Sequence, residues 1–213
     1  MPPLLKLEAL APLVQSPLHP EGASFEVEAG TTVAIMGPSG CGKSRLLRTI
    51  ADLEPSSGTV WLNGQEKETM PAPLWRRRVV YCAAESGWWA DRVGDHFQPS
   101  ARLTMALEAV GLPAEAMEWS IPRLSSGERQ RLALVRALTL PSEDGEGRVY
   151  LLDEPTAALD PDSTLRVERL LRSVLSPFCA VLMITHHREQ AVRLANRLLC
   201  FDAGRLVAKA LAP

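Results

Sequence analysis

Apolar residues along this chain form short runs that alternate with stretches of helical periodicity. Thr32 to Met36 is such a run and ends at Gly37, a pattern typical of a buried strand. The residues after it place four apolar side chains on one helical face: Leu46, Leu47, Ile50 and Ala51. Three further strand candidates are Val79 to Ala83, Val149 to Leu152 and Ala180 to Ile184. Strands that alternate with helices predict an α/β fold with a mainly parallel sheet.

Turn and capping signals add the remaining elements. Glu54 to Gly58 is turn-like and precedes a strand at Thr59 to Leu62. Gly127 to Leu138 has the periodicity of a helix. Another helix is expected after Asp160-Pro161, because Asp suits the N-cap and Pro the first helical position. Leu198 to Val207, with Asp202 to Gly204 in its middle, predicts a hairpin.

The pattern changes between Glu85 and Arg123. Prolines and glycines interrupt the helical periods there, and four of the five tryptophans of the chain lie between Trp75 and Trp119. We interpret this segment as a helical lobe inserted into a domain built on a sheet. The chain is therefore expected to be a single domain over residues 1–213, with a helical subdomain at about 85–140.

Composition and charge exclude several classes of protein. Lys and Arg number 23 and Asp and Glu 25, and this net charge of −2 argues against a nucleic-acid partner held by bulk charge. A hydrophobic content of 46% excludes a disordered chain. No apolar run reaches the roughly 18 residues that a membrane-spanning helix needs. The four cysteines form no CxxC pair and no zinc-type group with histidine, so a soluble protein in a reducing compartment is expected.

A phosphate-binding motif follows the first apolar strand. Its eight residues match G-x-x-x-x-G-K-[ST]: Gly37, Pro38, Ser39, Gly40, Cys41, Gly42, Lys43 and Ser44. Glycines let backbone N–H groups curl around an anion, and the following helix adds its positive N-terminus. Lys43 suits the β and γ phosphates of a nucleotide, and the Ser44 hydroxyl suits Mg²⁺. A glycine-rich turn with an incidental lysine is the alternative, which the flanking strand and helix disfavour.

Two adjacent carboxylates, Asp153 and Glu154, end a later apolar strand. Buried carboxylates are costly unless a cation lies nearby, and ligands of parallel sheets gather at the carboxyl ends of the strands. Asp153 suits a direct or outer contact to Mg²⁺, and Glu154 suits a general base that polarises the attacking water. The alternative is an acidic capping pair before Pro155. The phosphate-binding motif favours the functional interpretation.

Leu124 to Glu128, LSSGE, begins the helix over Gly127 to Leu138. Taken alone, it is a serine cap with an acidic first turn. Taken together, however, LSSGERQRLALVRAL, a strand and LLDEPTAALD form a specific series. From about Leu4 to Val207 the chain resembles the ATP-binding cassette (ABC) ATPases, in particular the stand-alone cassette subunits of bacterial ABC transporters. The segment around Trp75 to Ala83 is similar, more weakly, to the small cassettes assigned to metal (iron) export.

The resemblance implies a fold and further site residues. The fold is a P-loop NTPase (RecA-like) core with a mainly parallel sheet, an N-terminal antiparallel β-subdomain and an inserted helical lobe. Two copies of the chain would face each other head to tail, so that each ATP lies between one phosphate loop and the other subunit's signature: Ser125, Ser126, Gly127 and Glu128. Ala157 to Asp160 would form the D-loop, and His186 would contact the γ-phosphate beside the catalytic Glu154. Taken alone, His186 is better explained as a core histidine or as a histidine at the start of a helix.

The chain departs from the family pattern in several features, one of which is Glu128 where glutamine is common in the signature. Ala84 stands where the family carries a glutamine that links Mg²⁺ to the helical lobe. Glu85 is next to it and could supply an oxygen to Mg²⁺, or the contact is missing. Ser126 replaces a usual glycine in the signature. The family usually stacks adenine on an aromatic residue upstream of the phosphate loop, but no aromatic residue precedes Phe25 in this chain. Adenine would therefore use an aliphatic surface or bind weakly.

The resemblance implies an ATP-binding and ATP-hydrolysing subunit that powers solute transport through a separate integral-membrane permease. Such a subunit is cytoplasmic and peripheral on the inner face of the cell membrane. Two alternatives remain: a nucleotide-binding regulatory cassette with weak hydrolysis, and a soluble ABC protein outside transport.

By resemblance, the segment with Trp88 and Trp89 receives the permease. Adjacent tryptophans diverge in direction on a strand or a helix, so at least one is expected to be exposed. Burial of both in the lobe's own core is the alternative.

Overall fold

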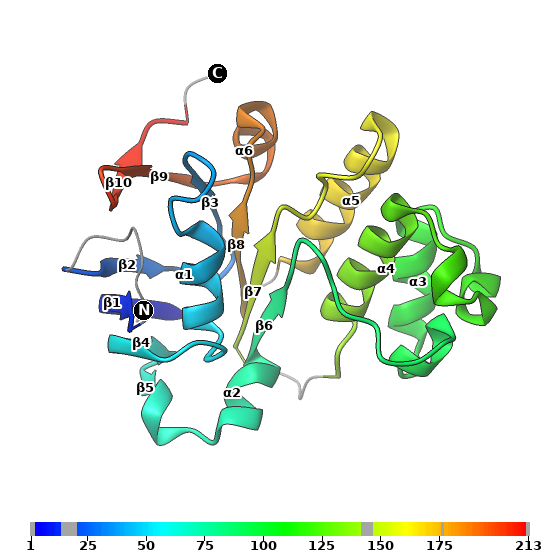
Figure 1. Cartoon of the computed structure of the whole chain (residues 1–213), viewed down its shortest axis with the longest axis horizontal. Helices are drawn as coiled ribbons and strands as arrows, with labels where there is room; N and C mark the ends of the chain where they lie inside the picture. Colours follow the sequence, from blue (N-terminus) through cyan, green and yellow to red (C-terminus); the bar gives the residue numbers. More distant parts are fainter. Residues whose placement is uncertain (1–2, 14–20, 142–146, 176, 212–213) are drawn as a thin grey trace. The chain divides into compact units, whose positions relative to one another are not determined.

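The structure is a computed structural model that describes residues 3–13, 21–141, 147–175 and 177–211 (Figure 1). It divides into two compact units. The first comprises the described residues within Met1–Tyr81, Ser142–Asp153 and Leu175–Pro213, and the second comprises Cys82–Pro141 with Glu154–Val174. No helix of the described residues is long and apolar enough to cross a membrane.

The first unit contains a six-stranded sheet in the order β10-β9-β3-β8-β7-β6. The strands are β3 (Thr32–Met36), β6 (Val79–Cys82), β7 (Arg148–Asp153), β8 (Cys179–Ile184), β9 (Arg197–Asp202) and β10 (Arg205–Lys209). β3 pairs in parallel with β8 and β9, and β8 pairs in parallel with β7. β10 folds back antiparallel on β9, so the predicted terminal hairpin is confirmed. The prediction of a mainly parallel sheet is also confirmed.

A second, antiparallel sheet has the order β2-β1-β4-β5, with β1 (Leu5–Pro12), β2 (Ala23–Val27), β4 (Ser56–Leu62) and β5 (Gln65–Glu66). The prediction of a turn up to Gly58 is wrong at its end, because β4 already begins at Ser56. Gly58 lies within the strand at φ +79°, and a Cβ added there would lie 2.2 Å from the Ala9 carbonyl oxygen. The pairing with β1 shifts between Glu8 and Ala11. The glycine therefore belongs to a β-bulge, where two backbones approach closely.

The helices of the first unit are α1 (Lys43–Ile50), η1 (Lys67–Thr69, a 3₁₀ turn), α2 (Ala72–Arg78) and α6 (Arg188–Leu194). Leu46, Leu47 and Ile50 are fully buried on the predicted apolar face of α1. They share one core with apolar residues of both sheets. Because this core holds α1 against the strands, it also fixes the loop between β3 and α1.

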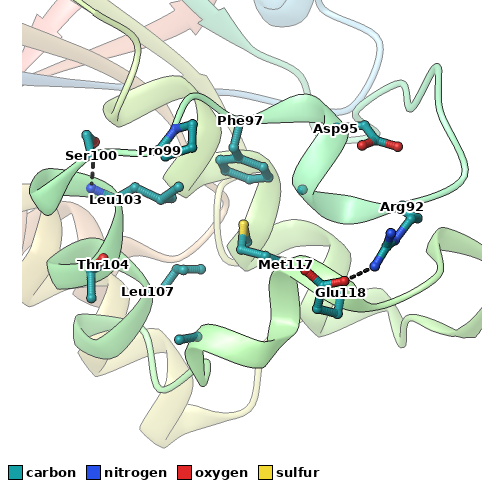
Figure 2. Close-up of a pocket in the computed structure, with 12 residues that line it drawn as sticks. Arg92, Asp95, Phe97, Pro99, Ser100, Leu103, Thr104, Leu107, Met117 and Glu118 are labelled. Atoms are coloured by element: carbon teal, nitrogen blue, oxygen red, sulfur yellow. Dashed lines mark hydrogen bonds and ion pairs between the residues drawn. The ribbon is translucent and has the colours of Figure 1, made fainter.

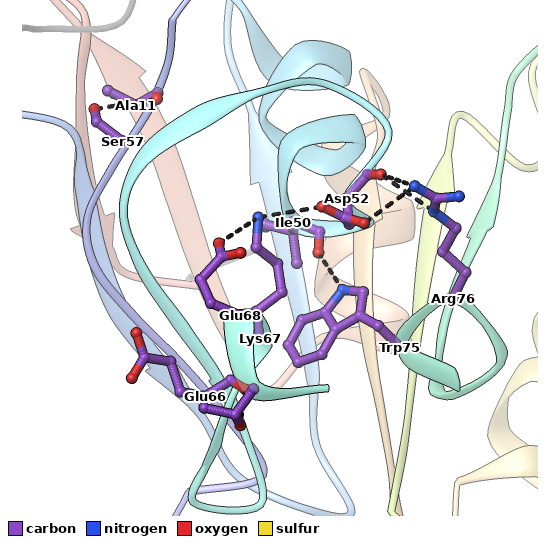
Figure 3. A network of polar contacts seen from close by, with 10 residues as sticks. Ala11, Ile50, Asp52, Ser57, Glu66, Lys67, Glu68, Trp75 and Arg76 are labelled. Atoms are coloured by element: carbon purple, nitrogen blue, oxygen red, sulfur yellow. Dashed lines mark hydrogen bonds and ion pairs between the residues drawn. The ribbon is translucent and has the colours of Figure 1, made fainter. Parts of the chain in front are cut away.

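Polar contacts fix the carboxyl end of α1 (Figure 3). The Trp75 indole, buried in α2, donates to the Ile50 carbonyl at 2.9 Å. Arg76 donates to the Asp52 carbonyl at 2.8 Å, and the buried Lys67 ammonium lies 3.4 Å from the Asp52 carboxylate. These bonds satisfy the carbonyl group of the last helical residue and the carbonyl and carboxylate groups of Asp52 just past the helix, where no intrahelical partner exists.

The second unit is helical. It contains η2 (Val93–His96), α3 (Ala101–Ala109), η3 (Ala114–Glu118), η4 (Ile121–Arg123), α4 (Ser126–Leu138) and α5 (Pro161–Val174), of which the η elements are 3₁₀ turns. The helix predicted from Gly127 begins one residue earlier, at Ser126. The predicted cap of α5 is present, because the Ser163 N–H donates to the Asp160 carboxylate at 2.9 Å.

Candidate functional site

Three segments with predicted site residues leave neighbouring strands at one edge of the six-stranded sheet. β3 leads into the phosphate loop, β7 ends at Asp153, and β8 is followed by Thr185 and His186. β8 lies between β3 and β7 in the sheet, and all three run parallel. Their carboxyl ends therefore meet at the same edge, which is where parallel sheets bind ligands.

The phosphate loop curls in the way that its glycines allow. Gly40 and Gly42 have φ values of +77° and +102°, in the left-handed region that side chains disfavour. A Cβ added at Gly37 would lie 2.8 Å from Cβ of Phe201 and 3.0 Å from Sγ of Cys41, so only glycine fits there. Gly42 is the N-cap of α1 and provides no side-chain cap, so it leaves the helix's first N–H groups to other acceptors. This is the local geometry of an anion cradle.

Lys43 lies at the centre of this loop. Its side chain is only 5% exposed, and Nζ donates to the carbonyl oxygens of Gly37 and Pro38, each at 2.9 Å. The Cys41 sulfur is 3.9 Å from the same ammonium. The two carbonyls that hold this buried cation are neutral acceptors. A phosphate can replace them, because a hydrogen bond from an ammonium to a charged acceptor is stronger than one to a carbonyl.

Asp153 ends β7 and is 5% exposed. The Tyr81 hydroxyl on β6 donates to its Oδ2 at 3.0 Å. Burial and the Asp153 carboxylate together raise the pKa of Tyr81 well above its ordinary value, while Arg48 acts in the opposite direction. Tyr81 is therefore a proton donor to Asp153. Sequence reasoning missed this residue, although a single hydroxyl in the apolar run VVYC was a signal.

The oxygen donors of this unit fit Mg²⁺ held together with a nucleotide. Among the described residues, no group of three or more His, Cys, Asp or Glu side chains could hold a metal ion. Mg²⁺ is usually bound by one or two protein oxygens plus substrate phosphates and water. Ser44, half-buried in the first turn of α1, and Asp153 supply that kind of donor set. Glu85 lies exposed in a bend after β6, in the second unit, and its metal role stays a prediction.

In the second unit, Gln130 of α4 holds the segment that starts at Glu154. Its Nε2 donates to the Glu154 carbonyl, and its Oε1 accepts from the Ala158 N–H, both at 2.8 Å. Glu154 itself has a left-handed φ of +49°, which is costly for a residue other than glycine. Gln130 thus joins the carboxylate-bearing residue to the predicted D-loop, and sequence reasoning missed it. Its place inside the motif LSSGERQ was the available signal.

The predicted signature forms the start of α4. Ser125 caps the helix in a capping box: its Oγ accepts from the Glu128 N–H at 3.2 Å, and its own N–H and hydroxyl donate to Glu128 Oε2 at 2.8 Å each. These bonds from Ser125 lower the pKa of Glu128. A Cβ added at Gly127 would lie 3.2 Å from the Ala158 carbonyl oxygen, so the signature approaches the D-loop closely. Ser126 is exposed.

His186 follows β8 and is exposed. The Thr185 hydroxyl before it accepts from the His187 N–H at 3.1 Å and donates to Gln190 at 2.8 Å. These bonds fix the backbone on either side of His186. The first unit thus brings the phosphate loop, Asp153 and His186 to one sheet edge. The second unit brings together Glu154, the signature and the D-loop up to Asp160, which is exposed.

The family model described as "ABC transporter" matches residues 20–157. This chain belongs to the ABC transporter family. It is 34% identical over 200 residues to the "Probable iron export ATP-binding protein FetA" of Escherichia coli (strain K12), covering 88% of this chain and 87% of that protein. It is 36% identical over 197 residues to the "Fe(3+) ions import ATP-binding protein FbpC 2" of Rhodococcus jostii (strain RHA1). The match covers 87% of this chain but only 56% of the Rhodococcus protein.

Solved structures show the same fold. The ATP-binding cassette MJ0796, in a dimeric post-hydrolysis state bound to ADP and Pi, superposes with a TM-score of 0.79. At 20% identity, the match covers 98% of this chain and 99% of that one. A bacterial Atm1-family ABC exporter with ATP bound gives a TM-score of 0.80 at 24% identity, covering 97% of this chain and 39% of that one. The predicted fold class is therefore confirmed for this ABC ATPase.

The second unit of the ABC ATPase also carries an aromatic cluster. Trp89 is 72% exposed and Trp88 is half-buried, which confirms the expectation that at least one is exposed. The Arg136 guanidinium of α4 lies 4.6 Å from the ring centre of Trp88 and 4.9 Å from that of Trp89. His96 contacts both rings edge to face, and its Nε2 accepts from the main-chain N–H of Trp89 at 3.0 Å. Cation–π stacking thus holds an exposed indole in a fixed position.

A cavity of about 390 Å³ lies in the same unit, between η2, α3 and η3 (Figure 2). Phe97, Leu103, Leu107 and Met117 give it an apolar wall, and an ion pair between Arg92 and Glu118 lies at one side. Ser100, also in the lining, caps α3 by accepting from the Leu103 N–H at 3.1 Å. An apolar hollow with a charged rim is the surface type that binds a partner's apolar side chains.

Proposed function

We propose that this chain binds ATP with Mg²⁺ at its phosphate loop, hydrolyses it with Glu154 as the base, and thereby powers transport through a separate membrane permease. The observation that carries the proposal is Lys43, a buried cation held at the centre of the loop by the Gly37 and Pro38 carbonyls. A phosphate chain entering the loop gives this ammonium charged acceptors in place of neutral ones.

Each predicted site residue of the chain that holds the phosphates then has a task. Gly37 to Ser44 present backbone N–H groups and Lys43 to the phosphates. Ser44 and Asp153 would hold Mg²⁺, which when bound neutralises the charge that builds up on the phosphates. His186, placed by Thr185, would donate to the γ-phosphate. Glu154 would accept the proton of the attacking water.

A second copy of the chain would complete the site. Ser125, Ser126 and Gly127 would contact the ATP held by the partner's phosphate loop, because α4 presents its positive N-terminus there. The Ser125 hydroxyl now donates to Glu128, so it must turn from that carboxylate to reach a phosphate. Asp160, at the end of the D-loop, would face the partner as well. The dimer that MJ0796 forms with ADP and Pi bound is an assembly of the kind that this arrangement requires.

The permease would contact the second unit. We propose that Trp88, Trp89 and the cavity beside η2 form the docking surface, since exposed aromatic residues held by a stacked arginine are typical of interface hot spots. This surface would place the chain on the inner face of the membrane.

The names of the relatives give no single cargo or direction. They include iron export, Fe(3+) import and, for an Agrobacterium fabrum protein that is 36% identical, aliphatic sulfonate import. Cargo and direction would therefore reside in the permease.

The test is nucleotide binding and turnover by the purified chain. The wild-type chain should bind ATP. It should release phosphate from ATP only when Mg²⁺ is present. Lys43→Ala should lose tight ATP binding, by about 2–3 kcal/mol or roughly a hundredfold, because a charge-assisted bond is removed. Lys67→Ala is the matched control, since it removes another buried lysine of the same unit away from the loop. Unchanged ATP affinity in Lys43→Ala would rule out the phosphate-loop assignment.

A regulatory cassette with weak hydrolysis is the second candidate, favoured by Ala84 and by the engaged Ser125 hydroxyl. The two candidates differ in turnover with the permease present. A motor subunit should hydrolyse ATP faster when co-purified with its membrane protein, whereas a regulatory cassette should bind ATP equally well and show no stimulation.

A further inference from the structure

The Asp153 carboxylate is held by a side chain from a neighbouring strand. Tyr81 of β6 and Asp153 of β7 are 72 residues apart in the sequence, and their side chains meet at 3.0 Å. β6 neighbours β7 in the sheet, so the two side chains leave adjacent strands. A phenol is a neutral proton donor, and its bond goes to Oδ2. A carboxylate has two acceptor oxygens, so Oδ1 can still serve as a metal ligand.

Arg48 of α1, the helix that starts in the phosphate loop, interacts electrostatically with Tyr81. Arg48 is itself fixed, because its Nε lies 2.6 Å from Glu54 Oε1. A guanidinium cannot accept a hydrogen bond, so the Asp153 carboxylate is the acceptor for the Tyr81 hydroxyl proton.

We propose that Tyr81 is a positioning residue that fixes the Asp153 carboxylate for Mg²⁺ in the nucleotide complex. This inference rests on the proposed function, in which Asp153 contacts the metal. Tyr81 does not touch substrate or metal; it acts through Asp153 by fixing the rotation of the carboxylate and leaving Oδ1 for the ion. Ala84 offers no side-chain oxygen, whereas the Tyr81 hydroxyl connects β6 to Asp153.

The direct test removes only the hydroxyl. Tyr81→Phe should weaken Mn²⁺ binding to the ATP-loaded protein about tenfold, measured by electron paramagnetic resonance with Mn²⁺ as the probe, as expected when a partner of a metal ligand is lost. Affinity for ATP in the presence of EDTA should stay unchanged. Tyr150→Phe is the matched control, because Tyr150 is the other tyrosine of the chain, lies on the same strand as Asp153 and is 1% exposed.

A second measurement leaves Tyr81 in place. In Tyr150→Phe protein labelled with 3-fluorotyrosine, Tyr81 is the one labelled residue, so a single ¹⁹F resonance reports on its hydroxyl. Adding Mg²⁺ to the ATP-loaded protein should shift this resonance, because the ion changes the charge on Asp153. ATP without metal should leave it nearly in place. This measurement stands even if Tyr81→Phe does not fold.

The outcomes distinguish a failure of the positioning role of Tyr81 from a failure of the proposed metal site. Wild-type Mn²⁺ affinity in Tyr81→Phe, or a ¹⁹F resonance unmoved by Mg²⁺, overturns the positioning role. An equal loss of metal-free ATP binding in Tyr81→Phe also overturns it, because the role would then be general packing. If Asp153→Asn binds Mn²⁺ as well as wild type does, the proposed metal site itself fails.

Discussion

Gln130 donates its side-chain amide to the main-chain carbonyl of Glu154 at 2.8 Å, and the other end of the same amide accepts from Ala158 at 2.8 Å. One side chain therefore fixes both ends of the turn that carries the proposed base. Because these bonds go to main-chain atoms, they hold the turn whatever side chain stands at 154.

Replacement of Gln130 should slow turnover without affecting ATP binding. Gln130→Leu loses both bonds, so Glu154 loses its orientation and turnover should fall about tenfold or more, with ATP affinity nearly unchanged. Gln130→Glu keeps the acceptor for Ala158 and loses the donor to Glu154, so an intermediate rate is expected. Steady-state turnover and equilibrium ATP binding, measured separately, test this. Wild-type turnover in Gln130→Leu would show that the turn from Glu154 to Ala158 keeps its conformation without Gln130.

Glu154→Gln should bind ATP and turn over roughly a hundred- to ten-thousandfold more slowly, the usual effect of losing a general base. The substitution keeps the shape of the side chain, and the contact from Gln130 to the carbonyl is unaffected. ATP should then trap a dimer, seen as a larger species by size-exclusion chromatography. Glu168→Gln, which alters a buried carboxylate of α5, is the control. Wild-type turnover in Glu154→Gln would mean that another group is the base.

ATP should protect Cys41 from alkylation. Cys41 is half-buried within the phosphate loop, with its sulfur 3.9 Å from the Lys43 ammonium, so bound phosphates would cover it. Saturating ATP should slow its reaction with iodoacetamide about tenfold or more, since only free protein reacts. Cys179, half-buried at the start of β8, provides an internal control in the same peptide map. Equal rates at Cys41 with and without ATP would count against the loop as the nucleotide site.

The two adjacent tryptophans should differ in their effects. Trp89→Ala removes an exposed ring and should change the free energy of unfolding by about 0.5 kcal/mol or less. Trp88→Ala removes a half-buried ring stacked on Arg136 and should cost about 1–2 kcal/mol. Denaturant unfolding measures both.

Trp89→Ala should also prevent co-purification with the membrane subunit while ATP binding persists. Met105→Ala, which removes another exposed apolar side chain of the same unit, is the control for that pull-down. Intact partner binding in Trp89→Ala, with a large loss of stability, would identify the ring as a structural residue.

Glu128 should make the chain more sensitive to acid. Its hydrogen bonds from Ser125 lower its pKa in the folded state, so the carboxylate stabilises the fold above its unfolded pKa of about 4.3. That stabilisation is lost as the pH falls through the lower folded value. The stability difference between wild type and Glu128→Gln should therefore shrink as the pH falls from about 5 to about 3. Denaturant unfolding across this range tests it. Ser125→Ala is expected to weaken the same pH dependence without removing it, because the main-chain N–H at position 125 still donates to Glu128. A constant difference would refute the effect.

The local features of this protein could be read from its sequence. The phosphate loop needs glycine where its backbone is left-handed, as at Gly40 and Gly42. Because these glycines lie within one short motif, the loop can be predicted from the sequence. The serine cap of α4 and the aspartate cap of α5 are equally local, since each bond spans three residues. The turn predicted at Gly58 failed because a glycine signals either a turn or a bulge. Here the approach of Ala9, far away in the sequence, decides between the two.

By itself, the sequence thus determined the family, the alternation of strands and helices, and the residues that we propose for ATP binding and hydrolysis. Tertiary structure alone decided how those residues are held. Tyr81 meets Asp153 across 72 residues, Gln130 meets Glu154 across 24, and Arg136 brings Trp88 and Trp89 together from another helix. The reason is physical: a backbone conformation depends on the residue that adopts it, whereas a contact between distant side chains exists only after strand order and helix packing have placed them side by side.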